Sequence, residues 1–298
     1  MRLKADLSLL LVAIIWGSAF VAQRVAGQLG SVYLFNGARY ILAGLVVLPF
    51  AIASRRVAPA HLPRSQHKWM TLAGFLLFLA AAFQQAGMLY TTAGNAGFIT
   101  SLYVVLVPMI LLVGWREKPH RMSVVAVLVA GAGAYLLSTA GRLQVQRGDV
   151  FELVGALFWA LHVVVLGKFA SQFEPMTFSV GQLLICGILN LTLGVFIEQP
   201  VFTWGLAGAV LITAVLPLGL GYTLQVWAQK HTPPSDAALI LSLESVFAVL
   251  AGWIFLNEGL KGIQYAGCVL IFIAVALSQA KDWVPAGRMV VHQIVEDP

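Results

Sequence analysis

The feature that most constrains this chain is a succession of long apolar runs separated by short polar segments. Ten runs have about 20 residues each, the length that an α-helix needs to cross a bilayer. They lie near residues 6–26, 31–53, 68–92, 95–114, 122–140, 149–171, 175–197, 204–229, 235–256 and 262–280. The sequence therefore predicts an all-α integral membrane protein with ten transmembrane helices, followed by a cytoplasmic tail over residues 281–298.

The composition argues against a water-soluble fold. Of the 298 residues, 60% are apolar and 10% are charged, whereas a soluble domain carries about 25% charged residues. The net charge of +6 comes from basic residues in the short loops between apolar runs. Basic residues in such loops set the orientation of a membrane protein, so they do not indicate a nucleic-acid-binding surface. Cys186 and Cys268 lie inside apolar runs, so we expect no disulfide framework, metal site or cofactor.

The basic residues also predict the orientation, because cytoplasmic loops carry an excess of Lys and Arg. With the N-terminus inside, thirteen of the 18 Lys and Arg residues fall on the cytoplasmic side. Only four fall on the opposite side, namely Arg24, Arg142, Arg147 and Lys261. We therefore expect a multi-pass protein of a bacterial-type inner (plasma) membrane, with both termini in the cytoplasm.

The two halves of the chain resemble each other at an offset of 141 or 143 residues. The matching positions are Ser101-Leu102 with Ser242-Leu243, Glu117 with Glu258, Trp16 with Trp159, Phe35 with Phe178, Arg39 with Gln182 and Gly44 with Gly187. Five spans per half is an odd number, so the second copy would cross the membrane with opposite polarity. The sequence predicts inverted five-helix repeats over residues 1–140 and 148–280, an architecture typical of secondary transporters with a midplane substrate site.

Glu244 is the sharpest candidate for a functional side chain. It lies about ten residues into its span, near mid-bilayer, where an ionised carboxylate costs about 2.5–3.5 kcal/mol. Such a group must face the interior of the bundle, pair with another group, or stay protonated. It can bind the ammonium group of a substrate or act as a protonation switch, or it can be a structural glutamate hydrogen-bonded between helices.

Arg39 is the second ionisable candidate. It lies about eight residues, or roughly 12 Å, from the outer end of its span, although its long side chain can extend outward. It can bind a substrate carboxylate, or tie helices together through carbonyl groups and Glu244. The match with Gln182 favours the tethering role, because it indicates a polar contact and not a required charge.

Polar and aromatic residues follow single faces of several predicted helices, at spacings of three or four residues. These faces carry Trp16, Phe20 and Gln23; Gln84 with its neighbour Phe83; Thr100 and Tyr103; Glu152, Trp159 and His162; and Tyr222 and Gln225. Such faces cannot all contact lipid, so we expect them to line a cavity with aromatic walls. For a single aromatic residue, ordinary packing or an interfacial belt is the alternative, and His162 can titrate or can be an interhelical histidine.

Backbone features point to the same region. Pro217 stands in a Leu-Pro-Leu-Gly-Leu-Gly segment in the middle of the eighth span and should interrupt it. Gly131 and Gly133 can loosen the fifth span or allow another helix to pack closely, and close packing fits glycine better.

Several motifs resemble those of the EamA-like branch of the drug/metabolite transporter superfamily. They are Trp16-Gly-Ser-Ala-Phe20, Arg39, Ser101-Leu-Tyr-Val-Val-Leu-Val-Pro108, Ser242-Leu-Glu-Ser-Val-Phe247, Glu117 and Glu258. The resemblance covers residues 5–280 and implies a ten-helix carrier with inverted repeats and no ATPase domain. It also implies export of small metabolites, with exporters of aromatic and other neutral amino acids (the YddG type) as the nearest functional group. Ser245 departs from the pattern, since many relatives have proline there.

The expected function is therefore secondary export of small metabolites, most of all neutral and aromatic amino acids, by alternating access. A multidrug or quaternary-cation exporter of the same superfamily is the alternative, because aromatic walls and one buried glutamate also suit a lipophilic cation. An intramembrane enzyme would need a reactive pair or a nucleophile motif, and the sequence shows neither. The expected partners are a small-molecule substrate and the lipid bilayer.

Overall fold

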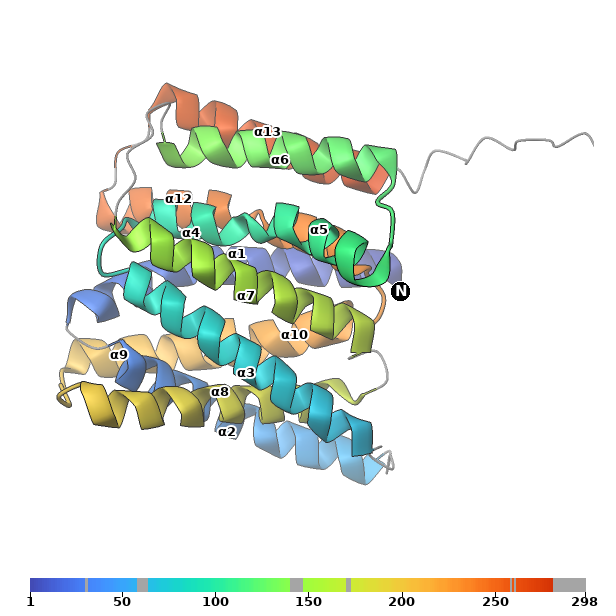
Figure 1. Cartoon of the computed structure of the whole chain (residues 1–298). Helices are drawn as coiled ribbons and strands as arrows, with labels where there is room; N and C mark the ends of the chain where they lie inside the picture. Colours follow the sequence, from blue (N-terminus) through green and yellow to red (C-terminus); the bar gives the residue numbers. More distant parts are fainter. Residues whose placement is uncertain are drawn as a thin grey trace, which may run out of the picture.

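The computed structural model of the chain describes residues 1–29, 32–57, 64–139, 147–169, 173–257, 259 and 261–280. Every regular element in these residues is helical (Figure 1). The α-helices are α1 (Arg2–Gln28), α2 (Tyr33–Val57), α3 (Arg64–Gly87), α4 (Ala93–Ser101), α5 (Tyr103–Trp115), α6 (Arg121–Thr139), α7 (Arg147–Phe169), α8 (Pro175–Ile197), α9 (Trp204–Thr213), α10 (Gly221–Ala228), α11 (Pro234–Leu241), α12 (Glu244–Leu256) and α13 (Gly262–Ala280), and η2 (Ala214–Leu220) is π-helical. The tail over residues 281–298 and Glu258 lie outside the described residues.

Within the described residues, eight helical segments are long and apolar enough to cross a membrane. Three of them are composite: α4 with α5, α9 with η2 and α10, and α11 with α12. Two shorter apolar stretches, Arg121–Leu137 and Gly262–Ser278, lie in α6 and α13. The prediction of an all-α, multi-pass membrane protein is confirmed for this part of the chain.

The two halves of the sequence are interleaved. The four most extensive helix contacts are α2 with α8, α6 with α13, α3 with α7 and α1 with α12. In each pair, one helix comes from residues 1–140 and the other from residues 148–280. Figure 1 shows α6 and α13 lying side by side along one edge of the bundle. Neither half therefore forms its own separate core.

Two predicted spans are interrupted where the sequence suggested continuous helices. The first break separates α4 from α5 at Leu102, and the second separates α11 from α12 at Ser242-Leu243. Serine hydroxyl groups accompany both breaks, because Ser101 donates to the carbonyl of Phe98 and Ser242 donates to that of Leu239, each at 2.7 Å. Hydroxyl groups that bond to preceding carbonyls bend helices. Each break lies at a matching position of the two halves.

The interruption expected at Pro217 is confirmed. The chain from Ala214 to Leu220 forms a π-helical segment between α9 and α10. Proline cannot donate a backbone hydrogen bond within a helix. The carbonyl of Pro217 accepts a hydrogen bond from the indole N–H of Trp16 at 2.7 Å, so α1 supplies a partner for this irregular backbone.

Glycines bring helices into backbone contact, as expected for the segment around Gly133. A Cβ on Gly133 would lie 2.7 Å from the carbonyl oxygen of Gly267, so α6 and α13 touch at these two glycines. A Cβ on Gly17 would lie 2.5 Å from the carbonyl oxygen of Glu244. The absence of a side chain at Gly17 therefore lets α1 lie directly against the start of α12.

We expect Gly17→Ala to lower the free energy of unfolding by about 1–3 kcal/mol, the usual cost of overpacking. Gly208→Ala is the matched control, because a Cβ at Gly208 meets no atom within 4 Å and alanine favours a helix over glycine by about 1 kcal/mol. The comparison is made by heating the two variants in detergent micelles and measuring the folded fraction at each temperature by size-exclusion chromatography. Equal midpoints of thermal unfolding for the two variants would contradict a direct contact between α1 and α12.

Candidate functional site

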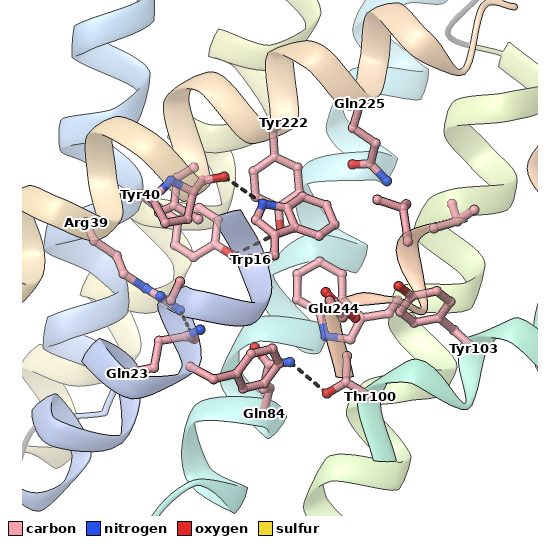
Figure 2. Close-up of a pocket in the computed structure, with 17 residues that line it drawn as sticks. Trp16, Gln23, Arg39, Tyr40, Gln84, Thr100, Tyr103, Tyr222, Gln225 and Glu244 are labelled. Atoms are coloured by element: carbon pink, nitrogen blue, oxygen red, sulfur yellow. Dashed lines mark hydrogen bonds between the residues drawn. The ribbon is translucent and has the colours of Figure 1, made fainter. Parts of the chain in front are cut away.

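A cavity lies where helices from both halves of the chain meet. Its lining comes from α1, α2, α3, α4, α5, α7, η2, α10, α11 and α12 (Figure 2). The residues are Trp16, Ala19, Phe20, Gln23, Arg39, Tyr40, Gln84, Thr100, Tyr103, Trp159, Val163, Pro217, Leu218, Tyr222, Gln225, Leu241 and Glu244. Eleven of the fourteen candidate residues named in the sequence analysis are among them, namely all except Phe83, Glu152 and His162. The helix faces with polar and aromatic residues thus converge as expected.

The cavity is narrow in this conformation. The space open to the centre of a water molecule is about 40 Å³. One buried water needs about 10–15 Å³ on this measure, so the cavity has room for roughly three waters. A ligand of the size of an amino acid requires the surrounding helices to move apart.

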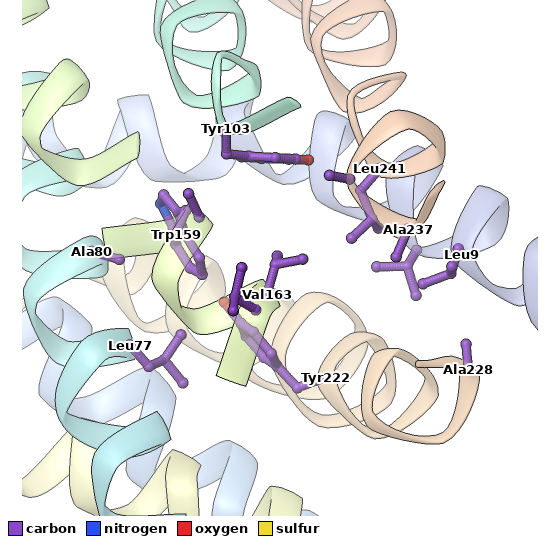
Figure 3. Packing of buried hydrophobic residues seen from close by; sticks show 14 of the residues in the cluster. Leu9, Leu77, Ala80, Tyr103, Trp159, Val163, Tyr222, Ala228, Ala237 and Leu241 are labelled. Atoms are coloured by element: carbon purple, nitrogen blue, oxygen red, sulfur yellow. The ribbon is translucent and has the colours of Figure 1, made fainter. Parts of the chain in front are cut away.

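Aromatic rings form one wall of the cavity. The ring of Tyr222 lies 5.0 Å from that of Trp16 and stacks on Trp159 at 6.3 Å, measured between centroids. Trp159 is 8% exposed and Tyr222 is 2% exposed, which excludes an interfacial belt for both. Both residues belong to a buried hydrophobic cluster that includes Leu77 and Val163 (Figure 3). The wall is therefore continuous with the packed core of the protein.

Arg39 borders the cavity as a buried cation, only 2% exposed. Its Nε donates to the side-chain oxygen of Asn36 at 3.0 Å, and its Nη2 donates to that of Gln23 at 2.9 Å. Its guanidinium carbon lies 4.8 Å from the centre of the Phe35 ring. The expected tether between helices exists, but its partners are side-chain amides. The suggested link to Glu244 is wrong, since no carboxylate in the described residues pairs with Arg39.

Glu244 is the buried carboxyl group of the cavity. It is 3% exposed and opens α12, directly after the second helix break. The hydroxyl group of Tyr103 points toward its carboxyl group (Figure 2). The contact does not reach hydrogen-bond geometry, which leaves Glu244 Oε1 and the Tyr103 hydroxyl unsatisfied within the described residues. Both residues line the cavity and can turn to a ligand.

Phe83 and His162 lie outside the lining. Phe83 packs between Phe158 and Phe151, with ring centroids 5.9 and 6.4 Å away. His162 is fully buried behind the aromatic wall, where its Nε2 shares a hydrogen bond of 2.9 Å with Gln182 and its ring stands edge-on to Tyr222. This arrangement fits the interhelical alternative for the histidine.

Gln23 lines the cavity together with Trp16 and Phe20, as the spacing along their helix face signalled. The structure also adds lining residues that the sequence analysis did not name. Tyr40 gave no such signal, because it directly follows Arg39 among apolar residues. Its hydroxyl lies 3.4 Å from that of Tyr222, which joins α2 to the aromatic wall.

We expect Trp16→Phe to lower the free energy of unfolding by about 1–3 kcal/mol, because it leaves the Pro217 carbonyl without its donor. Trp204→Phe is the matched control, since Trp204 is 84% exposed and should change stability by less than about 0.5 kcal/mol. Denaturation in detergent micelles measures both. A Trp16→Phe protein as stable as the control would contradict a supporting role for this hydrogen bond.

Comparison of the sequence with known proteins identifies the family of this chain. The model of the EamA-like transporter family matches residues 3–139 and again residues 146–279. An uncharacterised transporter of Archaeoglobus fulgidus is 37% identical over 277 residues, which cover 93% of this chain and 86% of that protein. The threonine/homoserine exporter RhtA of Salmonella typhimurium is 30% identical over 126 residues, or 42% of each chain.

The fold has a counterpart among solved structures. A crystal structure with 18% sequence identity has a TM-score of 0.79 and covers 94% of this chain and 98% of its own. This likeness shows a shared fold, and the family match extends over nearly all of the chain. The chain belongs to the EamA-like transporter family and is a membrane transporter, not an enzyme.

Proposed function

We propose that this transporter is a secondary exporter of amino acids, with broad specificity for neutral and aromatic ones. The observation that carries the proposal is a buried guanidinium group, Arg39, and a buried carboxyl group, Glu244, which line one cavity and can bear opposite charges. Neither has an ion-pair partner within the described residues. An amino acid carries one carboxylate and one ammonium group, so it can neutralise both charges at once.

The guanidinium group of Arg39 suits the substrate carboxylate. Arginine has five N–H donors, and Asn36 and Gln23 take two of them, which leaves three. Hydrogen bonds between guanidinium and carboxylate groups are about twice as strong as neutral ones. The amides of Asn36 and Gln23 also hold the guanidinium group in place before the substrate arrives.

The other end of the cavity suits the ammonium group and the side chain. Glu244 Oε1 has no partner among the described residues and can accept a charge-assisted hydrogen bond from an ammonium group. The rings of Trp16, Trp159 and Tyr222 offer an apolar surface to an aromatic or branched side chain. A wall of rings tolerates different apolar side chains, which fits broad specificity.

We propose that transport occurs by alternating access between two inverted five-helix repeats, with ten spans in all. Three observations support the repeats. The same family model matches both halves, the two helix breaks occur at matching positions, and basic residues concentrate on one side of the predicted membrane. Since the cavity has room for only a few waters, loading requires one repeat to move relative to the other.

The similarity to RhtA supports export of amino acids, because RhtA is named for export of threonine and homoserine. The proposed location is a bacterial-type inner membrane with both termini in the cytoplasm, as the basic residues indicate. Bacterial and archaeal relatives agree with such a membrane.

An exporter of lipophilic cations is the second candidate. The observation that favours it is the aromatic wall beside Glu244, which would attract a cation through ring faces and a carboxylate. Arg39 opposes it, because a buried cation in the same cavity repels a second one. An amino-acid substrate has a group for both Arg39 and Glu244, whereas a lipophilic cation has a group for Glu244 only.

Transport into liposomes tests the substrate. We expect purified protein to move labelled phenylalanine, and unlabelled phenylalanine to compete at least tenfold better than phenethylamine, phenylpropionate or tetraphenylphosphonium. Arg39→Gln and Glu244→Gln should each weaken apparent affinity by about 10–150-fold, since a hydrogen bond to a charged group is worth about 1.5–3 kcal/mol. The matched control is Lys118→Gln, which removes an exposed cation outside the cavity and should leave transport unchanged. If the protein transports tetraphenylphosphonium and transports no neutral amino acid, the result would support the second candidate instead.

Accessibility to a membrane-impermeant thiol reagent tests the inverted repeats. Lys118→Cys and Gly259→Cys occupy positions 141 residues apart and are both exposed. In a protein whose Cys186 and Cys268 are replaced by serine, we expect intact cells to be labelled at position 259 and not at position 118. Permeabilised cells should be labelled at both positions. Labelling of both in intact cells would contradict opposite polarity.

A further inference from the structure

A second buried carboxyl group lies behind the cavity, outside its lining. Glu152, in the second turn of α7, is 0% exposed, and its Oε1 has no hydrogen-bond partner in the described part of the chain. Its side chain packs on Gly87 of α3, where an added Cβ would lie 2.8 Å from Oε1. No Lys, Arg or His of the described residues forms an ion pair with it. A buried carboxylate without a cation partner is costly in a membrane, so this position favours a bound proton.

Hydrogen bonds join Glu152 to the cavity. The hydroxyl group of Thr100 donates to Glu152 Oε2 at 3.3 Å, and the side-chain amide of Gln84 donates to the Thr100 hydroxyl at 2.9 Å. Thr100 and Gln84 both line the cavity, and Figure 2 shows the bond between them. Since Oε2 accepts the bond from Thr100, Oε1 is the oxygen that is left to carry a proton.

A polar cluster also lies near Glu152, toward the end of the bundle. Asp149 lies one turn earlier, in the first turn of α7. Its Oδ1 accepts hydrogen bonds from the Asn95 amide at 2.6 Å and from the Thr91 hydroxyl at 3.3 Å. Thr91 and Asn95 lie between α3 and the first turn of α4, so this cluster stands where three helices begin or end.

Few other titratable groups approach Glu152 within the described residues. On α7 the nearest is Asp149, which adds a like charge. Arg24 of α1 donates to the backbone carbonyl of Thr91. Tyr90, after α3, packs on Gly148. The residues of α3 and α4 that contact Glu152 itself, Gly87 and Thr100, are uncharged.

We propose that Glu152 is the binding site for a proton that is exchanged for the exported amino acid, an inference that rests on the proposed function. In the empty carrier the proton is on Oε1. When a substrate enters, its carboxylate binds at Arg39 and its ammonium group lies on the side of the cavity lined by Glu244 and Thr100 (Figure 2). The positive charge is then the nearer one to Glu152 and favours its ionised form. The O–H bond then breaks, its electron pair stays on the carboxylate, and the proton passes to a water molecule.

The coupling follows from linkage. If a bound substrate lowers the affinity of Glu152 for a proton, a proton on Glu152 lowers the affinity for substrate by the same factor. Proton and amino acid therefore replace each other. Thr100 mediates this effect, because its hydroxyl can accept from the substrate on the cavity side while it donates to Glu152 on the other.

Two liposome assays test the proposal separately from the proposed function. Counterflow measures exchange of labelled for unlabelled phenylalanine at equal pH, and a second assay measures accumulation driven by a pH gradient. We expect wild-type protein to show both. At phenylalanine concentrations that saturate the carrier, Glu152→Gln, which imitates the protonated acid, should keep the rate of counterflow within about twofold, with a weaker apparent affinity for phenylalanine, and should lose gradient-driven accumulation. Glu117→Gln is the matched control, because Glu117 is 48% exposed in a surface ion pair with Lys168, and it should retain both.

Each outcome is decisive. Accumulation by Glu152→Gln equal to that of wild type would overturn the proposal, and so would loss of both activities in a folded variant, which indicates a structural role. Wild-type counterflow without any response to the pH gradient would also overturn it, while leaving amino-acid transport intact. Failure of wild-type counterflow would instead reject the proposed function.

Proton release provides a second measurement should Glu152→Gln fail to fold. Addition of phenylalanine to wild-type protein in weakly buffered detergent solution should release up to one proton per chain, read with a pH-indicator dye. Phenylalanine that binds without any release would overturn the proposal.

Discussion

A polar group within a bilayer has no water to bond with, so it must find its partners inside the protein. This constraint explains the arrangement around Arg39. Its guanidinium group is bonded to two amide side chains and lies against an aromatic ring. The same constraint places Trp16 against the carbonyl of Pro217, at the irregular backbone of the π-helical segment. The bond from Trp16 to Pro217 also crosses the boundary between the two halves, and so joins them at the cavity.

The sequence predicted those parts of the fold that follow from periodicity and from proline. Apolar runs gave the helices, and spacings of three and four residues brought Trp16, Tyr103 and Tyr222 to one cavity. The breaks at Leu102 and Leu243 were not predictable in the same way. They accompany serine side chains that bond to their own backbone, and Ser18 makes the same kind of bond within the uninterrupted helix α1.

The part of the candidate site that could be predicted is the set of side chains that share one face of a helix. Phe83 was placed wrongly with respect to the lining because residues adjacent in sequence point about 100° apart on a helix, so a neighbour of Gln84 faces elsewhere. The partners of Arg39 depend on the packing of α1 against α2, which no local pattern encodes. Matching positions of the two halves carry different residues: Arg39 corresponds to Gln182, and Tyr103 to Glu244. The two buried charges of the cavity therefore have no counterparts at their matching positions.

The pairing of α2 with α8, α3 with α7, α6 with α13 and α1 with α12 has a consequence for the origin of such a chain. Every one of these contacts is made across the midpoint of the sequence. An ancestor of half this length would have exposed all four surfaces to lipid unless another polypeptide covered them. Fusion of two genes would have made that partnership permanent, and would have allowed each copy to change its charged residues independently.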